Sequence, residues 1–188
     1  MGFPTNKITE EQIRKLVSES KNSFNPLNLM FTYEYATNLV MLNWNDIHFA
    51  TSNGFLAYEA AIDHAVIDVQ MHKNPTNEVL ELACMLREEA KFPHIIRQYV
   101  DKLVTKQNAL ESIEKFMYIS LSWVYEHKDD YCNLIEVVDI LCDESYYPNE
   151  VKSLISFMPK SDSTLNGLIN RLELYFNNQL KRWSRTDE

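Results

Sequence analysis

Hydrophobic residues recur three and four positions apart along most of the chain, the spacing that places side chains on one face of an α-helix. The strongest run extends from Ala109 to about His127, and its apolar residues occupy more than one face. A helix that is apolar nearly all round is expected to lie in the core. The pattern predicts an all-α protein of about eight to ten paired helices, an irregular helical bundle or a short α-solenoid.

Capping signals set the boundaries of these predicted helices. Thr9 and Gln12 have the spacing of a capping box, and Pro93 suits the first turn of a helix. The segment 29–41 is rich in strand-favouring Phe, Tyr and Val but also fits helical spacing, so we predict a helix there and keep a strand as the alternative. The other predicted helices span residues 9–21, 44–52, 57–72, 76–86, 93–103, 109–127, 131–142, 148–157 and 164–183.

The stretch from Leu42 to Val69 reads as two helices joined at one glycine. Asn43 is placed to cap the first helix, and Asp46 adds negative charge in its first turn. Gly54 can adopt the left-handed conformation that ends it. We expect the second helix to bury a stripe that consists of Ile62, Ala65, Val66 and Val69.

Length and composition favour one domain over residues 1–188, with an N-terminal helix and loop at 1–26 and a core at 27–183. The net charge of −9 argues against general nucleic-acid binding, because an acidic surface repels phosphates. No apolar run is long enough to span a membrane, and the first residues lack the pattern of a signal peptide. Three cysteines without a CxxC spacing indicate reduced thiols and a cytoplasmic protein.

Known catalytic and metal-binding motifs are missing from the sequence. Three glycines exclude the usual phosphate-binding loops, and no HExxH spacing is present, so we expect no cofactor, no metal and no catalysis. An enzyme with an unrecognised site around Asp63, His64 and Asp68 is a minor alternative. So is a cysteine nucleophile at Cys132 or Cys142, which would need a nearby histidine and a lowered pKa.

The segment 126–150 holds most of the excess negative charge, with eight acidic residues against one basic residue, Lys128. Such a run is either a solvated face or a docking surface for a basic protein. Tyrosines lie among the acids, and tyrosine is a common anchor residue at interfaces. The residues we predict to contact a partner are Glu126, Asp129, Asp130, Tyr131, Asp143, Glu144, Tyr146 and Tyr147.

Three blocks of residues within 27–183 form a recognisable pattern: Leu42, Trp44, Asp46, Ile47, Gly54, Phe55, Leu56, Ile62, Asp63 and Ala65, then Trp123, Val124, Tyr125, Glu126, Asp129, Glu136, Val137 and Val138, and finally Tyr147, Pro148, Glu150, Met158 and Pro159. This pattern resembles an uncharacterised bacterial all-helical domain family of unknown function.

The resemblance supplies no catalytic residues to carry over. It implies an association with contact-dependent or polymorphic toxin loci, and hence an immunity protein that occludes a cognate toxin. The acidic charge of the chain favours a basic toxin, such as an RNase or a DNase, as that partner. The alternative is a non-catalytic helical adaptor that binds other proteins and is unrelated to toxins.

Overall fold

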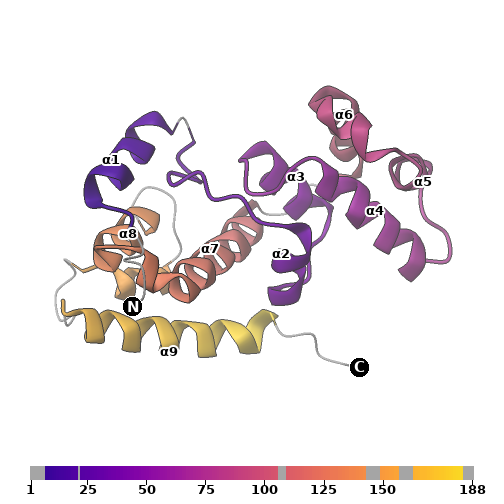
Figure 1. The fold of residues 1–188 in the computed structure, drawn as a ribbon. Helices are drawn as coiled ribbons and strands as arrows, with labels where there is room; N and C mark the ends of the chain where they lie inside the picture. The colour runs from indigo at the N-terminus through magenta and orange to yellow at the C-terminus, as the bar shows by residue number, and fades with distance from the viewer. Residues whose placement is uncertain (1–6, 21, 106–108, 143–148, 157–162, 184–188) are drawn as a thin grey trace, which may run out of the picture. The chain divides into compact units, whose positions relative to one another are not determined.

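The computed structural model describes residues 7–20, 22–105, 109–142, 149–156 and 163–183. These residues form nine α-helices and three short 3₁₀ helices, and they contain no strand (Figure 1). Two isolated parallel bridges join Ile8 to Tyr131 and Phe31 to Leu56. The predicted all-α fold is therefore confirmed. None of the described helices is long and apolar enough to cross a membrane.

The chain groups into two compact units, which we describe separately. The middle unit is Met30–Lys115, and the terminal unit combines Met1–Leu29 with Phe116–Glu188. Helix α7 (Ala109–Glu126) contributes its first residues to the middle unit and the rest to the terminal unit. One domain over the whole chain stays a prediction.

The middle unit is a succession of short helices, most of them begun by a side-chain cap. Asn43 accepts hydrogen bonds from the amides of Asn45 and Asp46, and Asp46 returns one to the Asn43 amide, which completes a capping box. Thr32 and Thr76 cap their helices more simply, because each side chain accepts one hydrogen bond from an amide in the first turn. The elements are α2 (Tyr33–Leu39), α3 (Trp44–Ser52), α4 (Glu59–Met71), α5 (Asn77–Ala83), η1 (Arg87–Lys91) and α6 (Pro93–Leu103).

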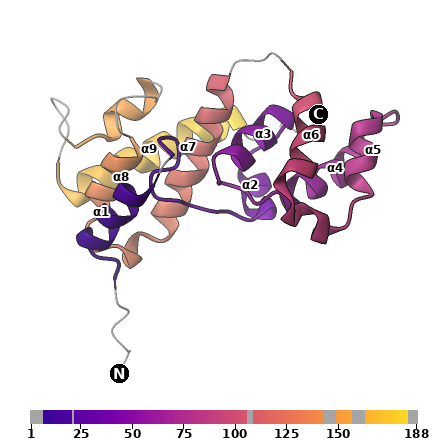
Figure 2. The same ribbon diagram turned by 90° about the horizontal axis from the view of Figure 1, so that it is seen from above.

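The terminal unit is built around the apolar part of α7, in which every residue from Phe116 to Ser122 is buried. Helix α9 (Leu165–Trp183) packs against α7, with the Tyr118 ring centroid 6.4 Å from that of Tyr175 and 6.0 Å from that of Phe176. Helix α1 (Glu10–Glu19) lies beside α8 (Leu134–Leu141) in both views (Figures 1 and 2). The 3₁₀ helices η2 (Lys128–Asp130) and η3 (Asn149–Leu154) complete it.

Several predicted boundaries and faces were wrong. The helix within 29–41 is limited to Tyr33–Leu39, because Phe31 pairs its backbone with Phe55 and Leu56 instead. Within 148–157, the described residues form the 3₁₀ helix η3. In α4, Val66 is exposed, and the buried face consists of Ala60, Ala61, Ile62, His64 and Ala65. Leu80 and Leu86, two apolar residues of the helix predicted over 76–86, are exposed.

Candidate functional site

The acidic turn, which we define as Glu126–Tyr131, connects the end of α7 to the residues before α8. Glu126, Asp129 and Asp130 are exposed there, as the sequence predicted for contact residues. Tyr131 is half-buried, and burial raises the pKa of its phenol, with a smaller contribution from the charge of Asp130. Four further predicted contact residues, Asp143, Glu144, Tyr146 and Tyr147, lie outside the described residues.

Two other acids of the charged segment bind within the terminal unit. Glu136 forms an ion pair with Arg14, at 2.8 Å from Arg14 Nε to Glu136 Oε1. Asp139 accepts hydrogen bonds from the amide of Ser156, at 2.8 Å, and from its hydroxyl. These carboxylates stabilise the fold, so they are not part of the exposed acidic surface.

The backbone of the acidic turn is fixed by the N-terminal segment. The Ile8 amide donates to the Asp130 carbonyl at 2.7 Å, and the Cys132 amide donates to the Ile8 carbonyl at 3.0 Å. This parallel bridge holds Tyr131 in an extended conformation. The helix predicted over 131–142 therefore begins only at Leu134, after the cap residue Asn133.

Aromatic residues that were not among the predicted contacts lie next to the acids, in the last turn of α7 and just after its end. The rings of Trp123 and His127 stack with centroids 4.0 Å apart. His127 Nδ1 donates to the Trp123 carbonyl at 2.8 Å. The Lys128 ammonium lies 4.7 Å from the ring centroid of Tyr125. The spacing of four between Trp123 and His127 on a predicted helix is the signal that could have identified this pair.

The alternative catalytic group, Asp63, His64 and Asp68, is divided among separate partners. Asp63 pairs with Arg87 at 2.5 Å. His64 is 9% exposed, and its Nδ1 lies 2.8 Å from the hydroxyl of Tyr33. Burial lowers the pKa of His64 to about 4, although the charges of Asp68 and Asp46 act in the opposite direction. A neutral histidine packed among aromatic rings is a structural residue rather than a proton donor at neutral pH.

Asp68 also belongs to a structural network. Its carboxylate accepts a hydrogen bond from Trp44 Nε1 at 2.8 Å and binds the exposed imidazole of His72. The Trp44 ring in turn packs edge-on against His64, with centroids 4.6 Å apart. No group of three or more potential metal-ligating side chains occurs among the residues described.

The two cysteines considered as nucleophiles differ in their environment. Cys142 is buried, and burial raises the pKa of its thiol, which keeps it protonated and unreactive. Cys132 is exposed and follows the acidic turn. The pKa of the Cys142 thiol is therefore shifted in the direction opposite to the one that a nucleophilic role requires.

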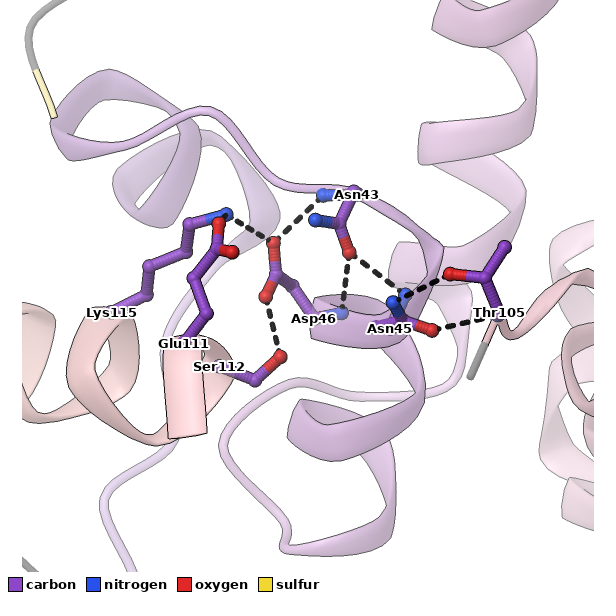
Figure 3. Close-up of polar contacts among 7 residues, drawn as sticks. All are labelled: Asn43, Asn45, Asp46, Thr105, Glu111, Ser112 and Lys115. Carbon is purple, nitrogen blue, oxygen red and sulfur yellow. Dashed lines mark hydrogen bonds and ion pairs between the residues drawn. The ribbon is translucent and has the colours of Figure 1, made fainter. Parts of the chain in front are cut away.

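A buried ion pair lies in the middle unit, where Asp46 of α3 faces the start of α7 (Figure 3). Asp46 Oδ2 is 2.7 Å from Lys115 Nζ, and Ser112 donates to Asp46 Oδ1 at 2.6 Å. Lys115 also contacts Glu111 at 3.0 Å. With Asn43 donating to the same carboxylate, Asp46 has partners for both of its oxygens (Figure 3). The sequence pattern predicted only that Asp46 adds negative charge to the first turn of the helix, and it did not predict the ion pair with Lys115.

The residues that carried the family resemblance have structural roles in the middle unit. Trp44 binds Asp68, Asp46 binds Lys115, and Asp63 binds Arg87. Gly54 has a φ of +72°, the left-handed conformation predicted for the end of α3. These contacts join helices of the middle unit to one another.

Neither the curated proteins nor the solved structures include a match to this chain. A family model described as an uncharacterized protein conserved in bacteria (DUF2247) matches residues 33–180. The match covers most of the sequence, and the chain belongs to this family.

Proposed function

We propose that this protein is a non-catalytic immunity protein that binds a cognate basic toxin in the bacterial cytoplasm and occludes its active site. The observation that carries the proposal is the pair of exposed carboxylates, Asp129 and Asp130, on a turn whose backbone is tied to Ile8. A fixed acidic surface fits a partner whose own surface is basic.

The charge of the chain supports this choice of partner. A net charge of −9 repels nucleic acid but attracts a protein that itself binds nucleic acid. An RNase or DNase toxin must hold phosphates, and its active site therefore carries positive charge. Electrostatic steering would accelerate the encounter, and the bound acidic surface would exclude the substrate.

The aromatic residues beside the turn supply contact area that charges alone do not. The stacked rings of Trp123, in the last turn of α7, and His127, just after its end, lie next to Glu126 in the chain. Tyr125 instead contacts α9, where its hydroxyl donates to Glu173. Aromatic side chains at the edge of a charged surface are typical anchors of protein interfaces. We propose that they pack against apolar atoms of the toxin while the carboxylates pair with its cations.

Co-expression tests the proposal directly. The C-terminal toxin domain encoded nearest to this gene is expressed in a bacterial host with and without the protein, and survival of the cells is measured. We expect rescue by the wild-type chain and loss of rescue by Asp129→Lys/Asp130→Lys. The matched control, Glu34→Lys/Glu88→Lys, makes the same charge change at two exposed acids of the middle unit and should still rescue.

The results of this experiment distinguish the immunity protein from the helical adaptor, the two functions that the sequence left open. Absence of rescue by the wild-type chain, together with co-purification of a housekeeping protein, would refute the immunity role and favour the adaptor. Equal rescue by both double variants would remove the acidic turn from the interface.

A further inference from the structure

The N-terminal segment contacts the acidic turn and the start of α8 through side chains as well as through its backbone. Asn133 Nδ2 donates to Glu10 Oε1 at 2.8 Å, and Arg14 Nε donates to Glu136 Oε1 at 2.8 Å. Together with the two backbone hydrogen bonds of Ile8, these contacts tie the start of the chain to residues more than a hundred positions later. The segment Ile8–Arg14 thus spans the whole length from Asp130 to Glu136.

The segment Ile8–Arg14 is held in place by a buried side chain and by a capping box of its own. Ile13 is 1% exposed, so the helix is held by an apolar side chain between Glu10 and Arg14. The capping box of Thr9 and Gln12 fixes where α1 begins relative to Ile8. Glu10 and Arg14 lie one turn apart, and their side chains contact each other at 3.4 Å. The contacts at both ends of the segment therefore depend on one short helix.

We propose that the segment Ile8–Arg14 is a clamp that fixes the backbone of residues 130–136 and so positions the carboxylates of Asp129 and Asp130 for the basic partner. The first half of this proposal concerns the protein alone, and the second half rests on the proposed function. Holding a binding turn in its bound conformation raises affinity, because less ordering remains to be done on association.

The location of the clamp in the chain makes it a distinct element. The family match begins at residue 33, so the clamp lies outside the matched region, whereas the turn that it holds lies inside. The clamp contributes no additional negative charge through Glu10 and Arg14, whose charges cancel. Its effect is on the conformation of the turn rather than on its electrostatic potential.

The test of the first half compares two double variants of α1. Glu10→Ala/Arg14→Ala removes both side-chain contacts of the clamp. The matched control Glu11→Ala/Lys15→Ala also replaces one acid and one base, one position later, at exposed residues of the same helix. Both variants keep the net charge and the capping box.

Amide hydrogen exchange of Ile8 and Cys132 is the readout, since these amides form the bridge. We expect exchange roughly three- to tenfold faster in Glu10→Ala/Arg14→Ala than in the control, with equal helix content. Equal exchange in the two variants would overturn the clamp, whatever the partner proves to be.

Binding kinetics with the toxin test the second half. We expect Glu10→Ala/Arg14→Ala to weaken affinity roughly threefold or more with an unchanged salt dependence, because the charges of the turn remain. Faster exchange with unaltered affinity would overturn the positioning role. If the wild-type chain binds no toxin, the proposed function fails, and the exchange experiment still decides the clamp.

Discussion

The carboxylate of Asp46 and the ammonium of Lys115 form an ion pair of 2.7 Å although 69 positions separate them in the sequence. Both side chains are almost completely buried, with 1% of Asp46 and 5% of Lys115 exposed. Removing charges from water is costly, and a buried pair is tolerated only when both partners are present and hydrogen-bonded. The pair therefore fixes the start of α7 against α3.

Removal of one partner of this pair should destabilise the protein strongly. We expect Lys115→Met to lower the free energy of unfolding by about 3 kcal/mol or more, because the Asp46 charge is left buried without its cation. Urea unfolding followed by circular dichroism measures the change. Lys15→Met, at an exposed lysine of α1, is the control and should cost less than about 0.5 kcal/mol.

The double variant Asp46→Asn/Lys115→Met tests whether the two charges act as a pair. We expect its loss of stability to be smaller than the sum of the two single losses, by about 1 kcal/mol or more. Strict additivity would show that the two side chains contribute independently, contrary to the ion pair described here.

Acidification should destabilise the protein through His64. Its pKa is about 4 in the folded chain and about 6.5 when unfolded, so the unfolded state binds a proton more readily between these values. The contribution of neutral His64 to the free energy of unfolding is fully present above about pH 6.5 and is lost as the pH falls toward 4. This difference in pKa corresponds to roughly 3 kcal/mol of unfolding free energy.

The variant His64→Asn separates this effect from the titration of carboxylates. We expect its unfolding free energy to change less between pH 7.5 and pH 4.5 than that of the wild-type protein. His94→Asn, at an exposed histidine, should follow the wild-type profile. Identical pH profiles for wild type and His64→Asn would contradict the burial of a neutral imidazole.

Gly54 should tolerate asparagine better than alanine. Its φ of +72° is left-handed, and a Cβ at this position meets no atom within 4 Å, so only the backbone conformation opposes a side chain. We expect Gly54→Ala to cost about 1 kcal/mol and Gly54→Asn distinctly less, since asparagine adopts this conformation more readily. Thermal unfolding of the two variants side by side measures the difference; a larger loss in the asparagine variant would argue against this account.

Neutralising the acidic turn should slow association with a basic partner. We expect Asp129→Asn/Asp130→Asn to reduce the association rate roughly threefold to tenfold at low salt and to flatten its dependence on ionic strength. Stopped-flow or surface binding measurements over a range of salt concentrations give both quantities. The charge-matched control Glu34→Gln/Glu88→Gln should change the association rate by much less.

Local signals in the sequence predicted much of the secondary structure. The caps at Thr9 and Asn43, and the proline at position 93, act within one helical turn, and each helix begins where they indicate. The continuous burial along α7 follows from its apolar composition in the same way. Long-range pairings could not be read from such signals.

The wrongly predicted elements and the contacts that were not predicted both depend on residues far apart in the sequence. Tyr131 was assigned to a helix because its neighbours fit a helical pattern, but Ile8 pairs with the backbone around it. Lys115 looked like an ordinary helix lysine until the fold placed Asp46 beside it. Likewise, the buried face of α4 consists of small side chains and His64, which a ranking by hydrophobicity does not select.

The amide of Cys132 donates a hydrogen bond to the Ile8 carbonyl, whereas the thiol of the same residue is exposed. Cys142 is buried, so replacing Cys84 by serine would leave one reactive position for a spin label or a fluorophore. Such a label would stand two residues from Asp130, on backbone anchored to the first described residues of the chain. The rotational mobility of the label would then report whether the segment Ile8–Arg14 is attached or released. This measurement does not require the partner to be identified.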